Sequence, residues 1–176
     1  MSDPDHVPNT HRVKHDSGAL VLGLGTMARM QEAIRRLFRL YGDPHGADDA
    51  HLLRSLTELS SAAMDVERAG IWLYDGARQA IVCSDLYERE EDRHSSGIRL
   101  EAAAYPAYFF ALQREVVIAA HDAQRDPITC EFRDGYLVPL GISAMLDAPI
   151  WREGRVIGVL CLEHCGPPRR WRSAEQ

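Results

Sequence analysis

The sequence predicts an α+β domain: an antiparallel sheet of about six strands with helices on both faces. Two pairs of apolar segments are joined by short polar turns, the pattern of β-hairpins and not of parallel βαβ units. Residues 69–74 and 79–83 flank Asp75-Gly76, and residues 143–150 and 154–162 flank a turn containing Glu153-Gly154. Helical periodicity before and between these pairs predicts the helices that cover the sheet.

Composition narrows the class of protein. The chain has 176 residues, 45% of them hydrophobic, which is enough for one domain with extensions. A net charge of −6 argues against nucleic acid as the main partner. The longest early apolar run, residues 19–24, is far shorter than the roughly 20 residues that span a bilayer. Four cysteines are too few for a disulfide scaffold, so we expect a cytoplasmic protein with reduced thiols.

The amino-terminal third divides into a tail and two helices. Residues 1–17 lack apolar periodicity, so we expect a disordered tail, and residues 18–47 are expected to form a helical extension. A further helix should begin at Asp48 or Asp49, open the main domain at 48–176 and end near Met64. The apolar stripes of the two helices are Met30, Ile34, Leu37 and Tyr41 in the first and Leu52, Leu56, Leu59 and Ala63 in the second.

The middle of the chain alternates short elements with polar loops. Residues 88–96 are charged and predict an exposed loop, and residues 97–100 predict a short strand. Residues 105–112 predict a helix with Pro106 in its first turn, and residues 116–119 predict a strand.

Two more helices are expected toward the carboxyl end. Thr129 can cap a helix that places Phe132, Tyr136 and Leu140 on one face. Pro139 limits the length of that helix. After the second hairpin, residues 171–176 are expected to begin a last helix. A start of this kind at the end of the chain suggests a piece of a longer protein, or a sensory module that has lost its output half.

Three stretches resemble the GAF domain, a small sensory module. Val117-Ile-Ala-Ala-His-Asp122 resembles the GAF strand that ends in an Asp-containing loop. Phe132-Arg-Asp-Gly-Tyr-Leu-Val-Pro139 resembles the helix that caps the GAF pocket. Residues 143–150 with the Ile-Gly-Val-Leu core of residues 154–162 resemble the last two strands. The chain is therefore similar to GAF domains attached to bacterial sensor kinases and diguanylate cyclases.

The resemblance implies a ligand cavity walled by two short aromatic helices. Residues 163–172 lack the Asn and Lys that GAF domains of the cyclic-nucleotide class carry, so a cyclic nucleotide is a disfavoured ligand. No cysteine is followed by the His often found after a bilin-anchoring Cys, so a covalently bound bilin is disfavoured as well. No cofactor is identified. Asp147 lies in an apolar strand, where a buried carboxylate needs a hydrogen-bonding partner. The ligand-binding candidates are Tyr105, Tyr108, Phe109, Asp122, Asp126, Thr129, Phe132, Arg133, Tyr136 and Asp147. Core packing is the competing interpretation for the aromatic members.

Two other functions remain open. GAF-fold free methionine-(R)-sulfoxide reductases use a cysteine in the region of Cys130, where a helix dipole would favour the thiolate. That family has further cysteines upstream, whereas residues 84–117 contain none. A ligand-free dimerisation module is the other alternative. No metal site is predicted, because Cys161 and Cys165 lack the spacing and the second pair of a zinc site.

We expect a non-catalytic sensory module. A homodimer through the terminal helices would pass a ligand-dependent bias to a histidine kinase or diguanylate cyclase output domain, linked or separate. The expected partners are that domain and an unidentified small molecule, with neither nucleic acid nor membrane.

Overall fold

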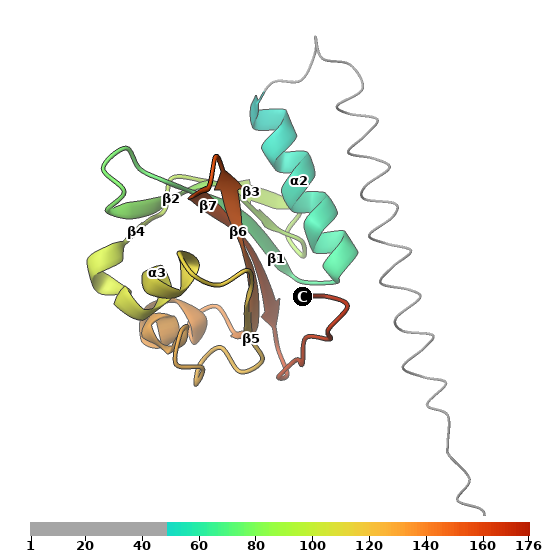
Figure 1. Ribbon diagram of the computed structural model, residues 1–176. Coiled ribbons are helices and arrows are strands. Elements are labelled where there is room, and N and C mark those ends of the chain that lie inside the picture. Colours follow the sequence, from blue (N-terminus) through green and yellow to red (C-terminus); the bar gives the residue numbers. More distant parts are fainter. Residues whose placement is uncertain (1–48) are drawn as a thin grey trace, which may run out of the picture.

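A seven-stranded antiparallel sheet separates two helical layers in the computed structural model, which describes residues 49–176 (Figure 1). The strands follow the order β3-β2-β1-β7-β6-β5, and β4 pairs with the far end of β2. The predicted fold class is confirmed. The strands are β1 (Arg68–Tyr74), β2 (Ala80–Glu88), β3 (Arg93–Ser95), β4 (Arg99–Glu101), β5 (Ile118–Ala120), β6 (Ile142–Arg152) and β7 (Arg155–Cys165).

One long helix, α2 (Asp49–Met64), covers one face of the sheet, and its bounds match the expectation. Thr57 is fully buried at the contact and donates its hydroxyl proton to Asp85 Oδ2 on β2 at 2.6 Å. The apolar residues clustered on this face are Met64, Val66, Ala69, Ala144, Leu146, Leu162 and Trp171. The helix is therefore held by one apolar layer and by a buried polar contact.

Short helical segments cover the opposite face. They are η1 (Ala102–Ala104), α3 (Pro106–Leu112), η2 (Cys130–Phe132) and η3 (Arg133–Leu137). Pro106 occupies the first turn of α3 as predicted, where its missing N–H costs no helical hydrogen bond. The larger apolar cluster lies between these segments and the sheet, so the aromatic segments and the strands share one core.

Two hairpins form the centre of the sheet, as the turn residues predict. β1 pairs with β2, and β6 pairs with β7, while β1 and β7 join the two hairpins. The β6–β7 turn places Glu153 at φ 51° and Gly154 at φ 73°, the left-handed pair that a tight two-residue turn requires. Gly158 is needed on β7 because a Cβ there would lie 2.2 Å from the Trp72 carbonyl oxygen.

The structure corrects three expectations. The predicted loop 88–96 contains β3, which pairs with the end of β2. The predicted helix after Thr129 is a 3-10 turn followed by a π-helix, because the Thr129 hydroxyl makes no cap and donates to the Ala123 carbonyl at 2.7 Å. Residues 171–176 form a turn and not a helix, with Trp171 buried under the sheet.

The expected tail and the first helix, 1–17 and 18–47, lie outside the described residues. No helix within residues 49–176 is long and apolar enough to cross a membrane.

Candidate functional site

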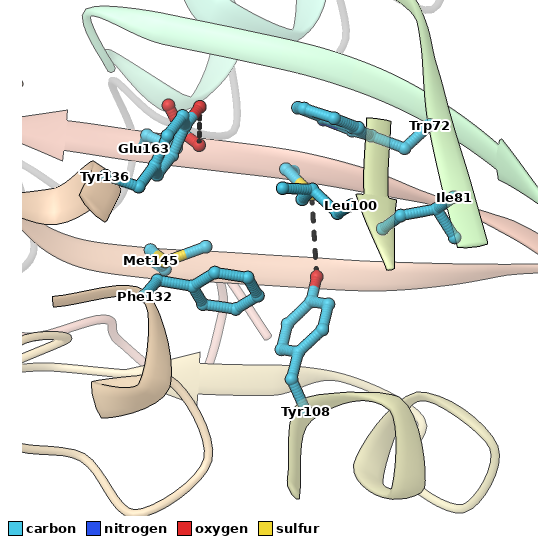
Figure 2. A pocket seen from close by; sticks show the side chains of 9 residues that line it. Trp72, Ile81, Leu100, Tyr108, Phe132, Tyr136, Met145 and Glu163 are labelled. Atoms are coloured by element: carbon cyan, nitrogen blue, oxygen red, sulfur yellow. Dashed lines mark hydrogen bonds between the residues drawn. The ribbon is translucent and has the colours of Figure 1, made fainter. Parts of the chain in front are cut away.

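A small cavity lies between the sheet and the α3–η3 layer (Figure 2). Its volume is about 10 Å³, which is room for about one water molecule. The lining is apolar except for a few hydroxyl, thiol and carboxylate groups. The lining residues are Trp72, Ile81, Leu100, Tyr108, Phe132, Tyr136, Met145, Cys161 and Glu163.

Predicted aromatic residues form the helical side of this site: Tyr108 and Phe132 line the cavity, and Tyr105 packs against Phe132 behind it. The Tyr105 ring stacks on Phe132 with centroids 4.2 Å apart, and the Tyr108 ring meets Phe132 edge to face at 4.8 Å. Such offset and T-shaped contacts add to the free energy of burial, so this cluster rigidifies the cover of the cavity. Phe109 turns away and packs edge to face on Tyr74 at 5.9 Å.

Tyr108 ties α3 to the sheet. Its hydroxyl donates to Asp147 Oδ2 at 2.5 Å. The same hydroxyl lies 3.7 Å from Cys161 Sγ. Asp147 is fully buried on β6, and burial raises its pKa to about 7, although the Tyr108 hydrogen bond opposes the shift. The same burial, with the charge of Asp147, holds the pKa of Tyr108 well above its usual value. The buried carboxylate of Asp147 thus has a hydrogen-bonding partner on the covering helix.

Tyr136 makes the equivalent contact from η3. Its hydroxyl donates to Glu163 Oε1 at 2.9 Å, a contact visible in Figure 2. Glu163 is 2% exposed, and its second oxygen accepts from Arg68 Nε at 2.8 Å. Burial raises the pKa of Glu163, while Arg68 and Tyr136 oppose that shift. Thus α3 and η3 each contact a buried carboxylate of the sheet through a tyrosine hydroxyl.

Alternating charges run across four strands from the cavity to the sheet edge. Glu163 on β7 faces Arg68 on β1, Arg68 faces Glu88 on β2, and Glu88 faces Arg93 on β3. Salt bridges join each pair, including Arg93 Nη2 to Glu88 Oε2 at 2.6 Å. Burial opposes ionisation of Glu88, yet its two arginine partners hold its pKa below the usual value. We call Glu163, Arg68, Glu88 and Arg93 the charge ladder.

Trp72 lies over a glycine on the sheet side of the cavity. A Cβ at Gly70 would come within 2.9 Å of Trp72 Nε1, so the indole occupies the space that a side chain would need. The Trp72 Nε1 proton is buried and has no acceptor among residues 49–176. An unsatisfied buried donor is costly, which marks this wall as a place where a polar atom of a ligand or a water would be stabilised.

Seven of the ten predicted site residues lie outside the cavity lining: Tyr105, Phe109 and Asp147, described above, and four residues that follow β5. Asp122 pairs with Arg125 at 2.8 Å, Asp126 accepts from the Ile128 N–H at 2.9 Å, and both organise the loop after β5. Thr129 is buried within the same loop. The exposed Arg133 pairs with Asp134. The structure therefore brings Tyr108, Phe132 and Tyr136 to the cavity wall, with Tyr105 and Asp147 directly behind, but not these four.

Cys130 begins the three-residue turn η2 and is half-buried. η2 runs directly into η3, so Cys130 lies at the start of a short irregular helical segment and not of the α-helix expected after Thr129. All four cysteines are free thiols, and burial raises the pKa of Cys83 to about 12 and that of Cys165 to about 11. Residues 49–176 contain no group of three or more His, Cys, Asp or Glu placed to hold a metal.

The sequence did not predict the buried pair formed by Glu163, which lines the cavity, and Arg68. Glu163 and Arg68 were not singled out, because register, and not spacing, brings them together. A signal existed for both: each is a charged residue at an end of a strongly apolar strand, where burial demands a partner.

Comparisons with known proteins agree with this architecture. The structure is similar to the GAF domain of an Acinetobacter phosphoenolpyruvate-protein phosphotransferase, with TM-score 0.61, 14% identity, and coverage of 85% of this chain and 82% of that one. The corresponding Coxiella burnetii domain gives TM-score 0.62 at 14% identity, covering 87% and 84%. A phycocyanobilin-bound GAF domain of a cyanobacterial phytochrome gives 0.63 at 16%, covering 85% of each.

At such identities these structures show the fold alone. No curated protein sequence matched significantly. The GAF domain family profile matches residues 50–176, which is most of the chain and includes every element described above. This protein belongs to the GAF domain family.

Proposed function

We propose that this GAF domain is a cytoplasmic sensory module of a bacterial signal-transduction protein and responds to a small ligand bound under α3 and η3. The observation that supports the proposal is a pair of hydrogen bonds that hold α3 and η3 against the sheet. Tyr108 donates to Asp147 and Tyr136 donates to Glu163, each from a covering segment to a buried carboxylate. Two separate segments therefore depend on hydrogen bonds that a ligand can replace.

The size of the cavity requires the cover to move. A space of about 10 Å³ accepts no organic ligand, so the described conformation is closed. A ligand with hydrogen-bond donors would compete with the two tyrosine hydroxyls for Asp147 and Glu163 and displace α3 and η3 outward. Its differential affinity for the open state sets the shift in population, and 1–3 kcal/mol is the typical coupling, about 5–150-fold.

The charge ladder offers a route from the cavity to the rest of the sheet. Glu163 belongs to the lining, whereas Arg93 at the other end is largely exposed on β3. A ligand that forms a hydrogen bond with Glu163 weakens the contact between Glu163 and Arg68. The change in Arg68 then affects its hydrogen bond with Glu88. Terminal helices of a homodimer would then carry the change to a histidine kinase or diguanylate cyclase output domain.

A test follows from the small size of the cavity. The purified full chain should retain a small molecule in native mass spectrometry, or gain thermal stability with members of a metabolite library. Met145→Trp fills the cavity and should abolish binding. Val116→Trp, at a residue that is 85% exposed, introduces the same side chain outside the cavity and should leave binding intact. Equal binding by both variants would place the ligand elsewhere and contradict the proposal.

A ligand-free dimerisation module is the second candidate, and the nearly filled core favours it. Analytical ultracentrifugation of the full chain separates the two. A stable dimer with neither a retained molecule nor a ligand-induced thermal shift supports dimerisation alone, whereas ligand-dependent change in sedimentation supports the sensor.

A further inference from the structure

A second, much larger hollow lies at the turn end of the sheet. Three segments converge there: the β1–β2 turn, the end of α3 and the β6–β7 hairpin, whose turn is at the same end of the sheet as the end of β1 (Figure 1). The lining residues are Arg78, Gln113, Trp151, Gly154, Arg155 and Val156. We call this the hairpin groove. Its volume of about 330 Å³ falls in the range of small-molecule sites, unlike the closed cavity.

The charged residues of the groove are cationic. Arg78 and Arg155 line it, and neither has a carboxylate partner within residues 49–176, where Arg89, Arg99 and five other arginines are ion-paired. The guanidinium of Arg78 is held over the Tyr74 ring at 4.3 Å instead, which positions it without neutralising it. No acidic residue belongs to the lining.

Strand register places a third arginine, which is not itself a lining residue, opposite Arg155. Arg152 and Arg155 are direct cross-strand partners on either side of the β6–β7 turn. Like charges opposite each other destabilise a sheet, and an anion beside the pair would relieve that repulsion. The neighbouring acids do not supply it: Asp75 is engaged by Arg99 at 2.7 Å, and Glu153 sits in the turn without an ion pair in the described part of the chain.

Trp151 also lines the groove and offers a flat apolar surface to it. It is 51% exposed, whereas Trp72 and Trp171 are 2% and 4% exposed. The hairpin that carries it ends in a tight turn, so the indole projects from a defined backbone and not from a long loop. A tryptophan next to guanidinium groups suits a planar ring that bears negative charge, because the ring can stack while the arginines bind the anionic group.

We propose that the hairpin groove binds a small planar aromatic anion, a ring carrying a phosphate or carboxylate group. Trp151 stacks on the ring, and Arg155 with Arg78 binds the anion. Gln113 supplies an amide for a polar edge of the ring. The groove is independent of the cavity under α3 and η3, because the two share no lining residue.

Calorimetry and tryptophan fluorescence of the full chain test this proposal. The phosphate probe is AMP and the carboxylate probe is benzoate, with adenosine and inorganic phosphate as the separate halves of AMP. At least one of the two aromatic anions should bind with Kd below about 1 mM, weaken with added salt and quench Trp151, while each half binds at least tenfold more weakly. Binding of AMP alone or benzoate alone identifies the anionic group.

Variants locate the binding. Trp151→Ala and Arg155→Ala alter exposed side chains and should each weaken binding at least tenfold. Arg125→Ala, which removes an exposed arginine on the loop after β5, should retain wild-type affinity. Absence of binding by both anions, or wild-type affinity in Trp151→Ala and Arg155→Ala, overturns the proposal.

Discussion

Arg68 and Glu163 face each other across the β1–β7 strand pair, with Arg68 Nε 2.8 Å from Glu163 Oε2. Their side chains are only 9% and 3% exposed, so each is the main compensation for burying the other. Although burial disfavours its charge, the Glu163 carboxylate raises the pKa of Arg68, which therefore stays protonated. The contact joins the two hairpins of the sheet and forms the polar wall of the cavity.

Arg68→Met should lower the free energy of unfolding by about 3–5 kcal/mol, because it leaves Glu163 and Glu88 buried without their shared cation. Urea denaturation of the full chain measures the change. Arg125→Met, which breaks an exposed pair, is the matched control and should change the value by no more than about 0.5 kcal/mol. Equal effects of the two substitutions would refute a structural role for the buried pair.

Asp147 should make stability fall as the pH rises from about 4 to about 7. Its pKa in the folded state is raised from 3.8 to about 7, so the folded protein binds this proton more tightly than the unfolded chain does. The stabilisation is complete below the unfolded value and is lost as pH rises through the folded value. The stability of Asp147→Asn should therefore rise relative to that of the wild type as the pH rises from about 4 to about 7, as measured by urea denaturation at each pH. A difference that does not change with pH contradicts the assignment.

Gly158→Ala should destabilise the domain by at least about 2 kcal/mol, because the new methyl group would meet the Trp72 carbonyl oxygen at 2.2 Å and force β1 and β7 apart. Thermal denaturation reports the loss. Gly76→Ala is the control, since a Cβ there meets nothing within 4 Å. A Gly158→Ala protein as stable as Gly76→Ala would mean that the two strands are not packed this closely.

Thr57→Val should cost about 1–3 kcal/mol, because valine keeps the shape but removes the hydroxyl that donates to Asp85 Oδ2 at 2.6 Å. Asp85 would then keep only His94 as a partner, with Nδ1 at 3.0 Å. Chemical denaturation measures the change, and Ala62→Ser on the exposed side of α2 should be nearly neutral. Because Thr57 lies on the helix and Asp85 on the sheet, a neutral Thr57→Val would show that this contact does not hold α2.

Local chemistry explains why much of the fold was predictable. Asp75-Gly76 and Glu153-Gly154 mark turns, and the apolar segments beside them form the hairpins β1–β2 and β6–β7. The stripe of α2 and Pro106 at the start of α3 depend on neighbours within a turn or two. The aromatic residues of α3 and η2–η3, which the family resemblance implies as cavity walls, pack in the larger apolar cluster.

Competing long-range contacts explain the errors. Thr129 has the chemistry of a cap, but its hydroxyl bonds to the Ala123 carbonyl in the preceding loop, and the chain continues as a 3-10 turn and a π-helix. Arg93 lies in a charged segment whose composition predicts a loop. Glu88 is its cross-strand partner and forms a salt bridge with it, so the segment pairs with β2 as β3. Trp171 packs in the apolar cluster of the α2 face with Ala144 and Leu162, and residues 171–176 form a turn where a helix was predicted.

The amino-acid sequence by itself determined the class of fold, both central hairpins and the aromatic character of the cavity cover, because turn chemistry and apolar periodicity act over a few residues. Only the tertiary structure decided that Glu163, Arg68, Glu88 and Arg93 form one ladder, that tyrosine hydroxyls fasten the cover to Asp147 and Glu163, and that the cavity is closed. The reason is physical: these contacts join residues up to 95 positions apart, and strand register, which no local pattern encodes, sets which of them meet.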